Sequence, residues 1–440
     1  MSEHILHFDW ETRYPVLTHG KGVFLYDLDG RELLDGSSGS ISNSLGHGRN
    51  DMAEHIYEQY KKMAHSLRYV SSTDVLKEAC NKLYEVTGID RMFLVTSGTE
   101  ATEIAVKLAR LHWLYQGRSQ KTKIISRWMG YHGYSMDALA WGGNIARRLD
   151  FTPYLRNDGH IPPPYCYRCW YGKDCKSCNL ECAQALEREI LCAGAENVAA
   201  FISETIVGTT LAAVDPPEGY YKKIREICDK YEVLMIADEV MCGSGRTGKM
   251  IAMDRYGVKP DIVVLAKALG GGYFPVGCVC TPERIIEPIK EHKHFKPGFT
   301  WSGNPVSAAV ILKTLEIIEE ENLLENVINM GDRLKKGFES MADRHPAIGN
   351  VRGIGLMLGI EFVKDKETRE CFEPEKKFAH TMNLNATKAG LMINPASGFH
   401  MGIKGDGTIV GPCFEVNENE IDLLLERFDK ALSVTESQLM

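Results

Sequence analysis

The chain of 440 residues lacks an apolar run long enough to span a bilayer, and its first residues lack the basic start and apolar stretch of a signal peptide. It also lacks an excess of positive charge, since the formal net charge at pH 7 is −8. We therefore expect a cytoplasmic protein that binds neither membranes nor nucleic acid. Repeats are absent too, and 44% hydrophobic residues predict a globular chain with a large core.

Short apolar runs alternate with helical patterns over most of the chain. Near the start, Asp29-Gly30 supplies a turn between two apolar-rich runs and predicts a hairpin. Later runs lack polar alternation, which is typical of strands buried on both faces of a parallel-rich sheet. The expected strands are Met92–Val95, Lys123–Ser126, Ala199–Ile202, Val233–Ala237, Ile262–Leu265, Val276–Cys280 and Gly355–Phe362. Helices are expected at Ala101–Arg110, Gly219–Tyr231, Ser307–Glu321 and Glu418–Leu432.

This alternation predicts an α/β fold with two parts. Residues 61–309 are expected to form a large central domain, with a cysteine-rich insertion at about 160–185. Residues 1–60 and 310–440 are expected to form a smaller α+β domain built from both termini.

A single lysine follows one of the most apolar runs. In Ile262–Gly272, a buried strand is expected to deliver Lys267 into a turn that contains three glycines. Partial burial would lower the pKa of the amine and make it nucleophilic, and the glycines let the backbone approach a bulky ligand. The alternative at this point is a lysine that simply caps the end of a strand.

A second strand ends in a carboxylate that suits a ligand. Asp238 follows Val233–Ala237, at the carboxyl end of a strand where open α/β sheets bind ligands, although an Asp-Glu pair there also fits a metal site. The next segment, Cys242–Gly248, has the composition of a glycine-rich active-site loop.

Ser97 and Glu100 have the spacing of a capping box at the start of a helix. The free amides of Gly98 and Thr99 there suit a phosphate, and an ordinary capped helix is the alternative.

Together, these three groups are the parts needed to hold pyridoxal 5′-phosphate (PLP). Lys267 would carry it as a Schiff base, Asp238 would face the pyridine nitrogen, and Ser97 to Thr99 would cradle the phosphate. Residues 22–421 resemble the class III, or ω-, aminotransferase family, above all in ADEVMCGSGRTGK and PDIVVLAKALGGG. The resemblance implies PLP fold type I, like that of aspartate aminotransferase, with a large mixed-sheet α/β domain and a smaller α+β domain.

The resemblance also implies roles for further residues. Tyr131 matches the aromatic residue that stacks on the pyridine ring, and Val240 matches the residue on the opposite face of the ring. Glu204 matches an acid near the ring, so Lys267, Asp238 and Glu204 are the expected catalytic residues.

His132, next to Tyr131, and Met241, next to Val240, are expected at the cofactor as well. Thr300 matches the threonine that reaches the phosphate in the partner subunit, which implies a homodimer with shared active sites.

The chain departs from its relatives in places. Met241 and Cys242 stand where many have glutamine or threonine, and Ser244 replaces an aromatic residue. In many relatives a C-terminal arginine binds a substrate carboxylate, but His400–Lys404 contains none, and Lys404 is a candidate substitute.

Thirteen cysteines are many for a chain without an export signal, and five lie between Cys166 and Cys182. Two C-x₂-C pairs have the spacing of zinc or iron–sulfur ligands. Some bacterial relatives resemble the chain here, which makes Cys166, Cys169, Cys178 and Cys182 the candidate ligands of a structural metal. The alternative is a loop with buried thiols.

Transamination is the leading functional prediction. An amine or ω-amino acid would donate its amino group, through Lys267, to a 2-oxo acid such as pyruvate or 2-oxoglutarate. A PLP-dependent lyase, epimerase or racemase on the same scaffold is an alternative, because the shared residues do not separate these reactions. A non-catalytic metal- or redox-sensing protein is a third alternative, against which the intact Lys267, Asp238 and Thr300 argue.

Overall fold

The computed structural model describes residues 4–293, 295–296 and 298–440. Its largest sheet has seven strands, which all run in one direction except β10. In sheet order they are β4 (Arg91–Val95), β10 (Gly277–Thr281), β9 (Ile262–Ala266), β8 (Leu234–Asp238), β7 (Val198–Glu204), β5 (Lys123–Arg127) and β6 (Gly159–Ile161). The strands expected in this part of the chain are confirmed with small shifts at their ends.

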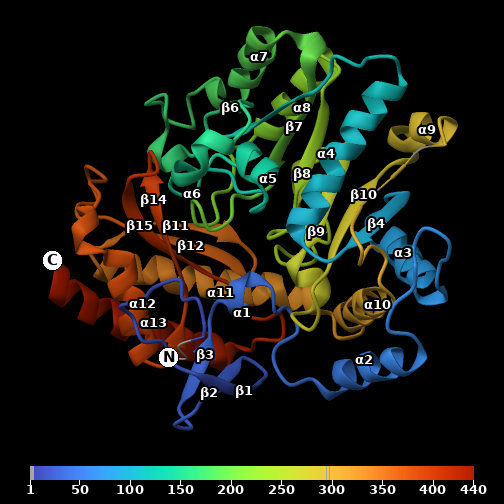
Figure 1. Ribbon diagram of the computed structural model, residues 1–440. Helices are drawn as coiled ribbons and strands as arrows, with labels where there is room; N and C mark the ends of the chain where they lie inside the picture. The colour runs from blue at the N-terminus through green and yellow to red at the C-terminus, as the bar shows by residue number, and fades with distance from the viewer. Residues whose placement is uncertain (1–3, 294, 297) are drawn as a thin grey trace.

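Helices cover both faces of this sheet (Figure 1). Successive side chains of a strand point to opposite faces, so Met235 packs in one cluster and Ile236 in the other. One face is covered by α4 (Gly98–Tyr115), α5 (Met136–Trp141) and α9 (Glu283–Glu291). The other is covered by α3 (Asp74–Thr87), α7 (Glu181–Ala193), α8 (Tyr220–Lys230) and α10 (Pro305–Glu320). The helices α1 (Ser38–Ile41), α2 (Asn50–Lys62) and α6 (Ile145–Arg148) lie outside these two layers, and α2 packs on α10.

The two ends of the chain meet in the smaller sheets. The N-terminal hairpin is confirmed, with Gly30 at a φ of +74° in its turn. One sheet contains β1 (Leu17–Lys21), β2 (Phe24–Asp27), β3 (Glu32–Asp35) and β13 (Leu391–Met392), and β13 runs parallel to β3. The other is antiparallel, in the order β11 (Ile348–Ile354), β12 (Met357–Phe362), β15 (Lys404–Val410) and β14 (Asn394–His400). Three helices pack here: α11 (Leu323–Arg344), α12 (Phe378–Lys388) and α13 (Glu418–Leu439).

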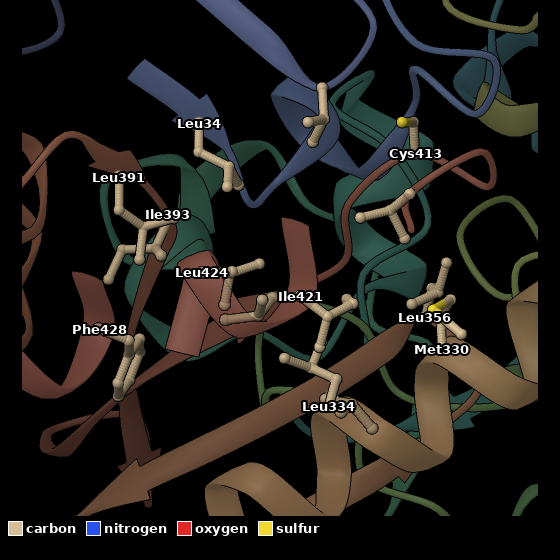
Figure 2. Close-up of a cluster of buried hydrophobic side chains, with 14 of the residues drawn as sticks. Leu34, Met330, Leu334, Leu356, Leu391, Ile393, Cys413, Ile421, Leu424 and Phe428 are labelled. Carbon is tan, nitrogen blue, oxygen red and sulfur yellow. The ribbon is translucent and has the colours of Figure 1, made fainter. Parts of the chain in front are cut away.

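One apolar core joins the two ends of the chain. Figure 2 shows Leu34 of β3 beside Leu391 of β13, with Leu424 and Phe428 of α13 below them. All four side chains are fully buried, so burial of apolar surface holds the N-terminal hairpin on the C-terminal helices. The domain boundaries expected at residues 60 and 309 stay predictions. Within the described part of the chain, no helix has both the length and the apolar character needed to cross a membrane.

Candidate active site

The carboxyl ends of three neighbouring parallel strands meet at one edge of the large sheet. β7 ends at Glu204, β8 ends at Asp238, and Lys267 directly follows β9. A cavity of about 660 Å³ opens at this edge, where open α/β sheets bind their ligands. Ten of the eleven residues expected at the cofactor line it: Ser97, Gly98, Thr99, Tyr131, His132, Glu204, Asp238, Val240, Met241 and Lys267.

Lys267 is only partly exposed, in the wall of the cavity. Its backbone has a φ of +46°, which is a strained conformation for a residue with a side chain. Burial lowers the pKa of the amine to about 8, although the carboxylates of Asp238 and Glu204 oppose this change. A large share of the amine is therefore neutral at slightly alkaline pH and can act as a nucleophile.

Asp238 is buried, and two donors hold its carboxylate. Nδ1 of His132 lies 2.8 Å from Oδ2, and the amide of Val240 donates to Oδ1 over 3.0 Å. A carboxylate only accepts hydrogen bonds, so Nδ1 of His132 carries a proton. The sequence predicted both residues at the site but not the bond between them. This bond orients the carboxylate of Asp238, which can accept from a cationic group of a ligand.

Glu204 is buried and organises the backbone around the cavity. Its two carboxylate oxygens accept from the amide of Tyr131 over 3.1 Å and from the amide of Gly208 over 2.8 Å. Burial is the main cause of the raised pKa of this carboxyl group. Glu204 thereby sets the position of Tyr131, whose ring lines the cavity.

The first turn of α4 faces the cavity. Oγ of Ser97 accepts from the amide of Glu100 over 3.1 Å, as predicted for the N-terminal cap of a helix. The carboxylate of Glu100 binds the amide and the hydroxyl of Thr96, each over 2.8 Å. In a capping box, the carboxylate of Glu100 would accept from the amide of Ser97. Here it accepts from Thr96 instead, one residue earlier in the chain.

Gly98 leaves room at the start of α4. A Cβ atom at this position would lie 2.9 Å from Cγ1 of Val240, so a side chain would force the helix and Val240 apart. The amides of Gly98 and Thr99 belong to the first turn, which has no partners within the helix, and they are suited to a phosphate. With the amine of Lys267 and the carboxylate of Asp238, this cradle completes a set of groups that fits PLP.

Arg147 also lines the cavity, and the sequence did not predict it. It belongs to the short helix α6, and its guanidinium lies 4.8 Å from the ring centroid of Tyr131. A helix of four residues has no periodic pattern that could have identified this side chain. Other lining residues that were not predicted include Ser40, Thr96, Thr210, Phe274 and Asn394.

A family described as aminotransferase class-III matches residues 9–432. The chain belongs to the class III aminotransferase family. Enzymes of this class use PLP, so the expected cofactor and PLP fold type I follow from membership.

Individual relatives of this class III aminotransferase cover almost the whole chain. The "uncharacterized aminotransferase YodT" of Bacillus subtilis is 35% identical, over 100% of this chain and 99% of its own. The taurine–pyruvate aminotransferase of Bilophila wadsworthia is 34% identical, over 96% and 93%. Among solved structures, the PMP-bound form of an aminotransferase from Vibrio fluvialis has a TM-score of 0.90 at 30% identity, over 97% of this chain and 94% of that one.

Three expectations for the aminotransferase need revision or stay open. No residue of the segment Cys242–Gly248 lines the cavity, and its Arg246 is buried and donates to the carbonyls of Leu356 and Pro412 instead. Lys404 does not replace the missing arginine, since its amine lies 2.8 Å from Glu373, outside the cavity. Thr300 is exposed and does not line the cavity of its own chain, so its role toward a partner subunit stays a prediction.

The cysteine-rich insertion is held against the small sheet by polar bonds. Glu361 of β12 is fully buried and accepts hydrogen bonds from Tyr165 and Arg168 of the insertion and from Arg352. This network fixes the start of the insertion on β12.

The predicted metal site has no support in the structure. Among the described residues, no group of three or more His, Cys, Asp and Glu side chains is arranged to hold a metal ion. The proposed set of Cys166, Cys169, Cys178 and Cys182 is therefore not assembled as a site. Burial, together with the neighbouring thiols, raises the pKa of the Cys166 and Cys182 thiols.

Proposed function

We propose that the protein transfers an amino group from an amine or ω-amino acid to a 2-oxo acid such as pyruvate or 2-oxoglutarate, with Lys267 holding PLP as a Schiff base. The observation that carries this proposal is the amine of Lys267, which has a pKa of about 8 and faces the same cavity as Asp238. Pyruvate is part of the name of the relative from Bilophila wadsworthia, which supports an acceptor of this class.

Bound PLP supplies an aldehyde for the donor amine and a protonated ring that withdraws electrons from the substrate carbon. The chain's own residues do the rest. Asp238, oriented by His132, would keep the ring nitrogen protonated, and the first amides of α4 would hold the phosphate. Lys267 would then take a proton from the substrate carbon and return it, since an amine whose pKa lies near the working pH serves both as a base and as an acid.

We also propose a homodimer in which Thr300 completes the phosphate site of the partner subunit. Thr300 is exposed, and it precedes Trp301, whose side chain is 53% exposed. Trp301 contacts His65, and Leu67 and Val70 of the same neighbouring segment are also exposed, so a group of exposed apolar side chains favours an interface here.

Chemical trapping tests the role of Lys267. Borohydride reduction of the PLP-loaded protein, followed by peptide mapping, should place the cofactor on the peptide that contains Lys267. Lys267→Ala should lose both the label and turnover. Donor alone should convert the bound cofactor of the wild type to the pyridoxamine form, whereas a lyase or epimerase would leave it unchanged.

Lys121 offers a matched control for this experiment. It is also buried, and burial lowers its pKa to about 8. Its amine, however, donates to the backbone carbonyls of Val198 and Glu232, each over 2.8 Å. Lys121→Met should keep the label on the Lys267 peptide. A label that persists in Lys267→Ala would contradict the proposal.

A further inference from the structure

We propose that Arg147 binds the acidic group of the amino donor, a carboxylate or a sulfonate, and thereby selects donors that carry one. This inference rests on the proposed transamination, because it assigns a substrate class to the same cavity. Arg147 would contact the substrate and determine specificity, and it would take no part in proton transfer.

The other charged groups that line the cavity already have functions or partners. Asp238 is bonded to His132, and Glu204 accepts from two backbone amides. Lys267 is reserved for the cofactor. The guanidinium of Arg147 forms no hydrogen bond or ion pair with any described residue, and it lies over the ring of Tyr131. Apart from Lys267, Arg147 is thus the cation among the described lining residues that has no counterion.

Hydrogen bonds around α6 fix the backbone of Arg147, whose side chain is exposed where it lines the cavity. The side chain of Asn144 accepts from the amide of Arg147 over 3.0 Å. The next residue, Arg148, donates to the carbonyls of Leu139 over 3.1 Å and Ala140 over 2.6 Å. Arg148 is therefore used to fasten the helix, while the guanidinium of Arg147 remains available.

The turn in which the C-terminal arginine was expected contains none, and α6 lies beside this turn. The turn between β14 and β15, where that arginine was expected, packs directly on α6. A Cβ atom on Gly402 of this turn would lie 2.5 Å from Cβ of Ile145. The cation at this side of the cavity therefore comes from α6, while Lys404 of the turn is paired with Glu373.

The chemistry of arginine suits the proposed ligand. Guanidinium is planar, stays charged at all working pH values and offers parallel N–H donors to two oxygens of a carboxylate or a sulfonate. A hydrogen bond between charged groups contributes roughly 10- to 100-fold in affinity.

Three donors of similar size separate the charge of the substrate from its shape. β-Alanine carries a carboxylate, taurine carries a sulfonate, and propylamine carries a methyl group in the same place. The rate at which each donor converts the bound cofactor of the PLP-loaded protein is measured by absorbance. Arg147→Gln should lower kcat/KM for the acidic donors by roughly 10- to 100-fold and leave propylamine within about threefold. The two acidic donors together show whether the carboxylate or the sulfonate is preferred.

Binding of propionate gives a readout that does not depend on turnover, because propionate has a carboxylate but no amine. Titration calorimetry on the PLP-loaded protein should show at least about tenfold weaker binding to Arg147→Gln, with Arg147→Lys between it and the wild type. Lys404→Gln is the matched control, a cation removed nearby but outside the cavity, and it should bind propionate like the wild type.

The two proposals can fail separately. Equal losses for propylamine and the acidic donors, or unchanged propionate binding in Arg147→Gln, would overturn the role of Arg147. A wild-type protein that converts no donor would instead contradict transamination, and propionate binding would still decide whether Arg147 holds an anion.

Discussion

Replacing Asp238 by asparagine removes one charge from the site and changes almost nothing in size. In the wild type both carboxylate oxygens accept, one from Nδ1 of His132 and one from the amide of Val240. Asparagine keeps one acceptor and turns the other into a donor, so it can satisfy only one of these neighbours without a change of tautomer in His132. The ring nitrogen of the cofactor would also lose its anionic partner.

Loss of one partner of a buried charged pair costs ~3–5 kcal/mol, and about 1.4 kcal/mol corresponds to tenfold. Asp238→Asn should therefore slow conversion of the bound cofactor by donor between roughly 10²- and 10⁴-fold. Stopped-flow absorbance under single-turnover conditions measures this step, and thermal unfolding shows that the variant is folded. Turnover within about tenfold of the wild type would refute the role of Asp238.

Glu239 provides a matched control, because it is the next residue and is equally buried. It bonds to Thr205 and to the amides of Ala252 and Met253, away from the cavity, and burial raises its pKa to about 7. Glu239→Gln should lower the melting temperature but leave the rate per folded site within about threefold. A rate loss as large as that of Asp238→Asn would show that any buried acid gives this effect.

Three further predictions concern the lysine, the phosphate cradle and the dimer. In the cofactor-free protein, Lys267 has a pKa of about 8, below its usual 10.5. Between these two pH values the unfolded chain binds more protons than the folded one. The free energy of unfolding should therefore rise from pH 8 to 10.5. Lys267→Met should then melt above the wild type at pH 7, and the gap should shrink toward pH 10.5; a gap that does not change with pH would contradict this. Gly98→Ala, which drives a methyl group against Val240, should weaken PLP binding in equilibrium dialysis by roughly 5- to 150-fold, since overpacking typically costs ~1–3 kcal/mol, and normal binding would refute the close fit. Sedimentation should show a dimer, and Thr300→Ala should lower its affinity for PLP; a fully active monomer would exclude the shared site.

The sequence predicted the parts of the site that lie next to strong local signals. Lys267 and Asp238 directly follow buried apolar strands, and Ser97 precedes a helix with clear periodicity, so their positions follow from short stretches of chain. The bond between His132 and Asp238 joins residues far apart in the chain and has no local signal. Arg147 was missed because α6 has only four residues and therefore no periodic pattern.

The glycine-rich segment Cys242–Gly248 shows why a composition signal can mislead. Glycines permit a close approach of any neighbour, whether ligand or protein. A Cβ atom on Gly245 would lie 2.9 Å from both Leu324 and Phe414, so the space belongs to side chains of the C-terminal part. The guanidinium of Arg246 satisfies backbone carbonyls there. Only the structure shows whether a glycine makes room for a ligand or for side chains of the protein.

The reversed strand β10 has a consequence for the order of synthesis. It lies between β4, which leads into the phosphate cradle, and β9, which leads into Lys267, and it follows both in the chain. A growing chain that ends before Gly277 already contains Lys267, Asp238 and the first turn of α4. However, β4 and β9 lie two strand spacings apart, about 10 Å, and without β10 no strand lies between them to pair with both. If these residues hold PLP, we expect capture of the cofactor to wait until residues 277–281 have inserted into the sheet. Since a ligand stabilises only the state that binds it, PLP would favour finished chains over incomplete ones.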